Sequence, residues 1–342
     1  MTQVAVIGGG AWGTAISIVL GRKSHHRVRL WALEEDVCET ISSRHINERF
    51  LPGYTIPDTV SATNNLAHAL DSAEIVVSVM PSHHCRRVFE DMAPALSSAV
   101  LFVSATKGVE NETLLRMTEV ITEVLGRRGK FKPRLGALSG PSFAREVARG
   151  DPTAITIASE DTDLAHVVQH EFSDPSFRVY TNDDVAGVEL GGALKNVIAI
   201  AAGVCDGLGL GHNTAAALIT RGLHEITRLA VACGARPETM SGLAGLGDLV
   251  LTCTGDLSRN RTVGVELGRG HKLAEIIAGM RGMVAEGVLT TNAAVGLARK
   301  YNVEMPITEQ MHAILQQGKS PRDAIHDLMT RRSTSEVAMY KS

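Results

Sequence analysis

The chain has 342 residues, more than one hydrophobic core usually organises, and this length predicts two domains. Its composition, with 44% hydrophobic and 21% charged residues, is that of a globular protein. A formal net charge of -3 offers no cationic surface and argues against binding to nucleic acid or to an anionic membrane.

The five cysteines are scattered and form no C-x-x-C pair. The sequence therefore predicts neither a disulfide framework nor a zinc site, and we expect no metal. No uninterrupted apolar run reaches the length of a membrane span. The N-terminus enters a strand directly, without a basic region or a cleavage site. These features predict a cytoplasmic protein without a membrane span.

The first twenty residues predict a strand, a glycine-rich turn and a helix. Residues 3–7 are a β-branched run typical of a buried strand, and residues 14–20 are typical of a helix. Between them Gly8, Gly10 and Gly13 form G-x-G-x-x-G. In this context the first glycine permits a tight turn, the second a close approach to a pyrophosphate, and the third packing of helix on strand. The N–H groups at the helix start then face an anion. The motif predicts dinucleotide binding.

The next predicted strand covers residues 28–32, and Glu34 follows it. An acidic side chain here can accept hydrogen bonds from the adenosine ribose and would repel a 2′-phosphate, so Glu34 favours NAD over NADP. The alternative is a carboxylate at a helix start, where the helix dipole favours it. Residues 44–65 are polar and irregular, and a loop of this length is often functional.

Further strands are predicted at residues 75–79, 100–104, 134–138, 154–158 and 177–181. A helix is predicted over about 111–126. The alternation of strands and helices predicts an α/β domain with a mostly parallel sheet covered by helices. Lys107 follows one of these strands at the carboxyl edge of the sheet, where ligands bind. It is either a surface lysine at a turn or a cation aimed at the active crevice. Ser142 is a candidate helix N-cap.

Strand patterns end near residue 183, and helical patterns continue to the end of the chain. Residues 185–205 are apolar on more than one side and predict a central buried helix. Lys195 lies inside this stretch, next to Asn196. A buried lysine has a lowered pKa and can exchange a proton with a substrate oxygen. The alternative is a lysine that extends to the wet edge of the helix.

Two polar clusters follow in the helical half. Asp248 comes after three glycines and is either an N-cap or a carboxylate that orients a nearby lysine. Residues 258–261, Ser-Arg-Asn-Arg, combine guanidinium groups, an amide and a hydroxyl at a helix start. Helix N-termini bind phosphate, and arginine matches its geometry, so this cluster predicts an anion site. The alternative is a charged helix cap.

Together these motifs resemble the bacterial NAD(P)-dependent sn-glycerol-3-phosphate dehydrogenases. The motifs are Gly8–Gly13 with Trp12, Lys107-Gly108, Ser139–Ser142, Leu194–Asn196, Gly245–Leu249 and Ser258–Arg261. The resemblance runs from the first strand to about residue 330. It implies reversible reduction of dihydroxyacetone phosphate for phospholipid synthesis, a Rossmann domain over 1–183, and an α-helical domain over 184–342 of the 6-phosphogluconate-dehydrogenase type. It also implies a homodimer.

The resemblance implies roles for individual residues. Lys195 would give and accept the proton, with Lys107 and Asp248 assisting. The implied substrate contacts are Lys107, Gly140, Ser142, Lys195, Asn196, Asp248, Thr252, Ser258, Arg259 and Asn260. The implied cofactor contacts are Gly8, Gly10, Ala11, Trp12, Gly13, Glu34, Lys107, Ala144, Arg259, Val284 and Glu286. Ala11 stands where the family often has serine, and Leu33 where an arginine is common, so NADP preference is in doubt.

Two other functions are compatible with the same features. A related dehydrogenase for a hydroxy acid or a sugar acid could use residues 258–261 to bind a carboxylate instead of a phosphate. A nicotinamide-sensing module would bind the cofactor and signal to a partner. Such a module needs no buried proton donor, so Lys195 and Asp248 argue against it.

Overall fold

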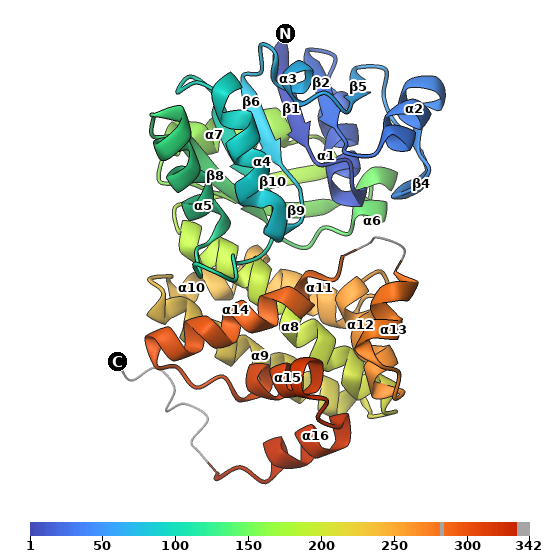
Figure 1. Cartoon of the computed structure of the whole chain (residues 1–342), viewed down its shortest axis with the longest axis vertical. Helices are drawn as coiled ribbons and strands as arrows, with labels where there is room; N and C mark the ends of the chain where they lie inside the picture. Colours follow the sequence, from blue (N-terminus) through green and yellow to red (C-terminus); the bar gives the residue numbers. More distant parts are fainter. Residues whose placement is uncertain (281–283, 334–342) are drawn as a thin grey trace. The chain divides into compact units, whose positions relative to one another are not determined.

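The computed structural model describes residues 1–280 and 284–333 and divides the chain into two compact units (Figure 1). The sheet unit comprises Met1–Lys107 and Arg116–Val185, and the helical unit comprises Gly108–Leu115 and the chain from Ala186 onward. The division after Val185 lies close to the expected boundary, but residues 108–115 belong to the other unit. The domain limits 1–183 and 184–342 stay a prediction, and residues 334–342 lie outside the described residues.

The sheet unit is built on a mostly parallel eight-stranded sheet, as predicted. Its order is β10-β9-β8-β7-β6-β1-β2-β5, and only the pairing of β8 with β9 is antiparallel. The strands are β1 Thr2–Ile7, β2 His26–Trp31, β5 Val60–Thr63, β6 Ile75–Ser78, β7 Leu101–Ser104, β8 Arg134–Ser139, β9 Thr153–Ala158 and β10 Phe177–Asn182. β1 lies between β2 and β6, so the strand order reverses at β1. Ligands bind at such a reversal.

The prediction of an irregular loop over residues 44–65 is wrong. β3 (Ile46–Asn47) and β4 (Leu51–Thr55) form an antiparallel hairpin, and β5 (Val60–Thr63) joins the main sheet beside β2. Pro52 obscures the second strand of the hairpin in the sequence. A two-stranded ribbon tolerates proline because each strand has an edge that makes no ladder hydrogen bonds.

The main helices of the sheet unit are α1 Ala11–Gly21, α2 Glu35–Arg44, α3 Leu66–Leu70, α4 Cys85–Met92, α5 Met117–Val124, α6 Ala144–Arg149 and α7 Thr162–Phe172. The helix predicted over 111–126 starts later, at α5. Leu114 has a positive φ of 60°, which interrupts helical backbone. The Arg116 N–H then donates to the Glu119 carboxylate at 2.8 Å, which satisfies a free donor where the helix begins.

The helical unit is organised around α8 (Val185–Gly207), which Figure 1 shows among the other helices of this unit. Most of its residues are buried, as predicted. Around it are α9 His212–Ala232, α10 Pro237–Met240, α11 Asp248–Thr254, α12 Arg259–Gly268, α13 Leu273–Gly279, α14 Glu286–Tyr301, α15 Pro306–Gln317 and α16 Pro321–Met329. Among the described residues, α8 alone has the length and hydropathy to cross a membrane, and 94% of its apolar window is buried inside the protein.

Glycines bring α8 and α12 into backbone contact. A β-carbon at Gly203 would lie 2.0 Å from the Arg261 carbonyl oxygen, and one at Gly264 would lie 2.0 Å from the Ile200 carbonyl oxygen. Any side chain at these positions would therefore push the helices apart. The close approach fixes the start of α12, which carries Ser258–Arg261, against the helix that carries Lys195.

A buried carboxyl group of α9 caps α15. Glu225 is 2% exposed and accepts hydrogen bonds from the Ile307 N–H and, at 3.1 Å each, from the N–H and the hydroxyl of Thr308. Burial raises the pKa of Glu225 to about 7, although these hydrogen bonds and the charge of Arg228 act in the opposite direction.

This cap predicts a pH-dependent stability of the helical unit. Because the pKa of Glu225 is higher in the folded than in the unfolded chain, the folded state binds more protons between pH 4.5 and 7. Its contribution to the free energy of unfolding should fall by roughly 3 kcal/mol as the pH rises across that interval. Glu225→Gln removes the titrating group, so urea unfolding of both proteins across this range isolates the effect. A wild-type-minus-variant difference that stays constant with pH would contradict the assignment.

Candidate functional site

The glycine loop between β1 and α1 is closely packed at two of its glycines and open at the third. Gly8 has φ 129°, and a β-carbon there would lie 2.8 Å from the Val79 carbonyl oxygen at the end of β6. A β-carbon at Gly13 would lie 1.9 Å from the Gly8 carbonyl oxygen, so this glycine allows the helix to pack on the turn. At Gly10 nothing lies within 4 Å of the β-carbon position. The first and third glycines are therefore demanded by packing, whereas the second faces open space.

The start of α1 carries two kinds of polar group, backbone N–H groups and an indole N–H. Gly10 is the N-cap and provides no side-chain cap for the first N–H groups of the helix. Ala11, the first helical residue, also brings no hydroxyl. The indole N–H of Trp12 is buried and has no hydrogen-bond partner in the described part of the chain. Buried donors are nearly always paired, so an acceptor from a ligand fits here.

The acidic residue after β2 lies at the start of α2. Glu34 occupies the N-cap position, close to the alternative of a carboxylate at a helix start. Its side chain nevertheless makes no capping hydrogen bond. Its carboxylate is thus not committed to the helix end. Leu33 beside it is 73% exposed.

Lys107, Gly140 and Ser142 lie together at the carboxyl edge of the sheet. The Gly140 carbonyl oxygen accepts from Lys107 Nζ at 3.4 Å and from Ser142 Oγ at 3.0 Å. The N-cap predicted at Ser142 is wrong, because Phe143 is the N-cap of α6 and Ala144 its first residue. Gly140 has φ 145°, and this turn directs the serine hydroxyl back to a carbonyl two residues earlier.

The helical unit holds a buried lysine–aspartate pair. Lys195 Nζ lies 2.9 Å from Asp248 Oδ1 and donates to Thr252 Oγ1 at 2.6 Å. The Thr252 hydroxyl in turn donates to the Asp248 carbonyl oxygen at 2.6 Å. Lys195 is 6% exposed, Asp248 1% and Thr252 3%. An ammonium held by a carboxylate and a hydroxyl in a dry environment can exchange a proton with an oxygen placed beside it.

These contacts exclude the alternative structural interpretations of Lys195 and Asp248. Lys195 does not extend to a wet edge, because its Nζ is bonded to buried groups of α11. Asp248 is not an N-cap, because it is the first residue of α11 and Gly247 precedes it as the cap. Asp248 and Thr252 lie one helical turn apart, so they present their side chains from the same face of α11 to Lys195.

The start of α12 is held by amide and hydroxyl groups. Asn260 Nδ2 donates to Asn196 Oδ1 at 2.9 Å, and Asn260 Oδ1 accepts from the Gly287 N–H at 2.9 Å. Ser258 is the N-cap, and its Oγ accepts from the Arg261 N–H at 3.2 Å. These polar atoms therefore connect α12 to α8 and α14.

The two arginines of this cluster differ. Arg261 is paired with Asp206 at 2.9 Å and with Asp256 at 3.0 Å. Arg259 is exposed and, among the described residues, forms no hydrogen bond or ion pair of its own. Glu286 is the first residue of α14, and Val284 precedes it, half-buried. Arg259 is therefore the cation of the cluster suited to an external anion.

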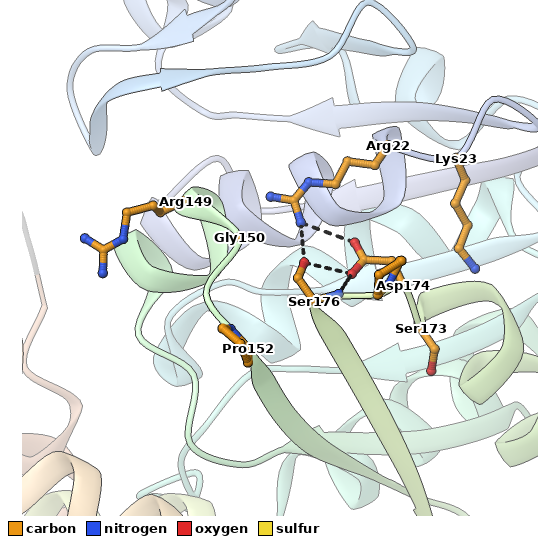
Figure 2. A pocket seen from close by; sticks show the side chains of 9 residues that line it. Arg22, Lys23, Arg149, Gly150, Pro152, Ser173, Asp174 and Ser176 are labelled. Atoms are coloured by element: carbon orange, nitrogen blue, oxygen red, sulfur yellow. Dashed lines mark hydrogen bonds and ion pairs between the residues drawn. The ribbon is translucent and has the colours of Figure 1, made fainter.

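A hollow of about 710 Å³ lies elsewhere on the sheet unit, beside Arg22, Lys23 and Arg149 (Figure 2). The cationic side chains around it make hydrogen bonds and ion pairs within the sheet unit. Arg22 donates to Asp174 at 3.2 Å and to Ser176 at 3.1 Å, as Figure 2 shows, and also to the Ala148 carbonyl oxygen at 3.1 Å. Arg149 is paired with Asp151. Lys23 Nζ donates to the His170 carbonyl oxygen at 2.6 Å. The hollow is thus a junction between helix ends, and its cations are bonded within the fold.

One group of side chains has metal-ligand spacing within the described ranges. The ligand atoms of His25, His26 and Glu171 lie within 4.8 Å of one another. His26 Nδ1 is bonded to the Leu20 carbonyl oxygen at 2.9 Å, and the Nε2 atoms of His26 and His25 contact Glu171 at 2.5 and 3.2 Å. Hydrogen bonds alone account for this cluster, and the expectation of no metal stays a prediction.

Comparison with known proteins finds similarity to one protein family along both units of the chain. Residues 3–165 match the model of the NAD-dependent glycerol-3-phosphate dehydrogenase N-terminus, and residues 184–326 match that of the C-terminus. A glycerol-3-phosphate dehydrogenase [NAD(P)+] of Koribacter versatilis is 72% identical, over 98% of this chain and 99% of its own length. One of Acidobacterium capsulatum is 57% identical, over 98% and 100%. The crystal structure of glycerol-3-phosphate dehydrogenase from Coxiella burnetii has a TM-score of 0.92 and 40% identity, covering 96% of this chain and 99% of its own.

Proposed function

This chain belongs to the NAD-dependent glycerol-3-phosphate dehydrogenase family, and on that premise we propose that it catalyses the reversible reduction of dihydroxyacetone phosphate to sn-glycerol 3-phosphate. The observation that carries the proposal is the buried group of Lys195, Asp248 and Thr252. A carbonyl reduction needs a proton for the oxygen that becomes a hydroxyl, and this group is suited to supply it.

The sheet unit is suited to hold the dinucleotide. The open space at Gly10 and the unpartnered indole N–H of Trp12 fit a phosphate-bearing ligand. The residues proposed to hold the cofactor are Gly8, Gly10, Ala11, Trp12, Gly13, Glu34, Lys107, Ala144, Arg259, Val284 and Glu286. When bound, a reduced nicotinamide supplies the two electrons and the hydrogen that reduce the carbonyl carbon.

Lys195 is proposed to give its proton to the substrate oxygen and to take it back in the reverse direction. Asp248 orients the ammonium, and Thr252 holds it from a second side. Positive charge near the carbonyl oxygen stabilises the negative charge that develops there, and Lys107 is proposed to add to it. Gly140, Ser142 and Asn196 are proposed as further substrate contacts.

Arg259 is proposed as the anchor of the substrate phosphate. Ser258 and Asn260, also predicted to contact it, are bonded within the helical unit and hold the start of α12 in place. The guanidinium and the N-terminus of α12 both favour a phosphate. Binding at a remote phosphate orients a small ketone for reaction.

The substrate is tested by NADH oxidation with dihydroxyacetone phosphate and with unphosphorylated keto acids. We expect kcat/KM to be at least about 10³-fold higher for the phosphorylated ketone, because uncompensated loss of a charge-assisted contact is costly. Arg259→Ala should raise the KM for dihydroxyacetone phosphate at least about tenfold. The matched control is Arg299→Ala, an arginine in the last turn of α14. Faster turnover of a keto acid would favour the hydroxy-acid dehydrogenase alternative.

The homodimer, the cytoplasmic location and the supply of product to phospholipid synthesis are part of the same proposal. Their support is the family and its resemblance to this chain over both units. Sedimentation velocity of the purified protein tests the first of them, and a monomer at micromolar concentration would contradict it.

A further inference from the structure

The β3–β4 hairpin carries a buried asparagine that contacts the glycine loop. Asn47 is 0% exposed. Its Nδ2 donates to the Gly9 carbonyl oxygen at 2.8 Å and to Thr14 Oγ1 at 2.8 Å, and its Oδ1 accepts from the Phe50 N–H at 3.0 Å. Because Oδ1 closes the local turn with Phe50, the amide directs its N–H groups at the Gly9 carbonyl oxygen in the loop and at the Thr14 hydroxyl in α1.

The contact fixes the peptide group that precedes Gly10. The carbonyl of Gly9 and the N–H of Gly10 belong to one planar trans peptide, so they point in opposite directions. Asn47 holds the Gly9 oxygen on the buried side. The N–H of Gly10 is thereby turned away from Asn47, at a residue where a β-carbon would meet no atom within 4 Å.

The loop needs such a restraint because its own residues restrict the backbone conformation very little. Gly8, Gly9 and Gly10 are consecutive, and glycine loses the most conformational freedom when it is ordered. The hydroxyl of Thr14 also donates to the Gly9 oxygen, but at 3.4 Å. The shorter bond comes from Asn47, 38 residues away in sequence.

We propose that Asn47 is a positioning residue for the dinucleotide, which presets the Gly9–Gly10 peptide so that the Gly10 N–H donates to a cofactor phosphate. This inference rests on the proposed cofactor role of the glycine loop. Asn47 is fully buried and acts through the loop instead of touching the ligand. Its loss therefore weakens cofactor binding and leaves the chemical step at saturating cofactor intact.

The test measures the Kd for NADH by fluorescence titration, without the ketone, on Asn47→Asp and Asn47→Ala. Asn47→Asp has the same shape and keeps the acceptor for Phe50, but it turns an oxygen toward the Gly9 oxygen. We expect Kd to rise at least about tenfold in both variants, with kcat at saturating NADH within about twofold of wild type.

The matched control is Asn65→Asp in the same unit. Asn65 is the N-cap of α3 and accepts from the His68 N–H at 3.0 Å, a role that aspartate keeps. It adds the same charge, and the amide N–H groups that it removes donate to none of the described residues, so its Kd should stay within about twofold of wild type. A Kd for NADH unchanged in both Asn47 variants, with only a lower melting temperature, would overturn the positioning role. A wild-type protein that does not bind NADH would instead overturn the proposed function, and the role of Asn47 with it.

Discussion

Lys195→Ala is expected to lower kcat for the reduction of dihydroxyacetone phosphate by about 10³-fold, the middle of the range for loss of a general acid. The Kd for NADH, measured without the ketone, should change by less than about twofold, because Lys195 is not among the residues proposed to hold the cofactor. Steady-state kinetics and fluorescence titration check the two values. Turnover near the wild-type rate would remove Lys195 from the mechanism.

The effect of Lys195→Ala on folding stability must be separated from its effect on turnover. Removing Lys195 leaves Asp248 buried without its ion-pair partner, a loss that costs about 3–5 kcal/mol in buried pairs. The double variant Lys195→Met/Asp248→Asn removes both charges. It should recover most of the lost stability and none of the lost turnover. Recovery of turnover together with stability would show that the pair has only a structural role.

Lys300→Ala is the matched control for the loss of a lysine. Lys300 is in the same unit, exposed in the last turn of α14, and its Nζ lies 5.4 Å from the centre of the Tyr301 ring. This alanine variant should keep both kcat and the melting temperature close to wild type, since exposed substitutions rarely change stability by more than about 0.5 kcal/mol.

The second large effect concerns the choice of cofactor. We expect kcat/KM with NADH to exceed that with NADPH by at least about tenfold, which corresponds to about 1.4 kcal/mol. Where β2 ends, Leu33 is exposed, and Glu34, Glu35 and Asp36 follow it. A 2′-phosphate placed there would meet carboxylates, and Arg49, a cation of the same region, is already bonded to Asp36 at 3.2 Å.

Leu33→Arg tests the cause of this preference. The side chain of Leu33 is exposed, so arginine fits without disturbing the core. The variant should lower the KM for NADPH about tenfold and leave that for NADH nearly unchanged, because only NADPH carries the extra phosphate. Leu33→Gln, with similar length and no charge, is the control. Equal rates with both cofactors in the wild type would contradict the reading of Glu34 as a residue that favours NAD.

The mostly parallel sheet, the buried helix α8 and the glycine turn could be predicted from the amino-acid sequence alone. These features are local. A continuous apolar strand, a wide apolar helix and three closely spaced glycines each report their environment within a few residues. Lys195 could likewise be singled out because a charge among apolar neighbours is unusual, and the structure places it in a buried environment.

Which side chains contact one another could not be predicted in this way, because it depends on how distant segments pack. Thr252 reaches Lys195 across 57 residues, and Asn47 reaches the glycine loop across 38. Nothing in the polar stretch around Asn47 distinguishes it from a solvated loop residue, and the hairpin that buries it is obscured by proline. Ser142 was misassigned for the same reason, because its partner depends on the turn at Gly140. A hydrogen bond between distant segments is set by how the elements pack, and a single sequence carries no periodic or local signal of that packing.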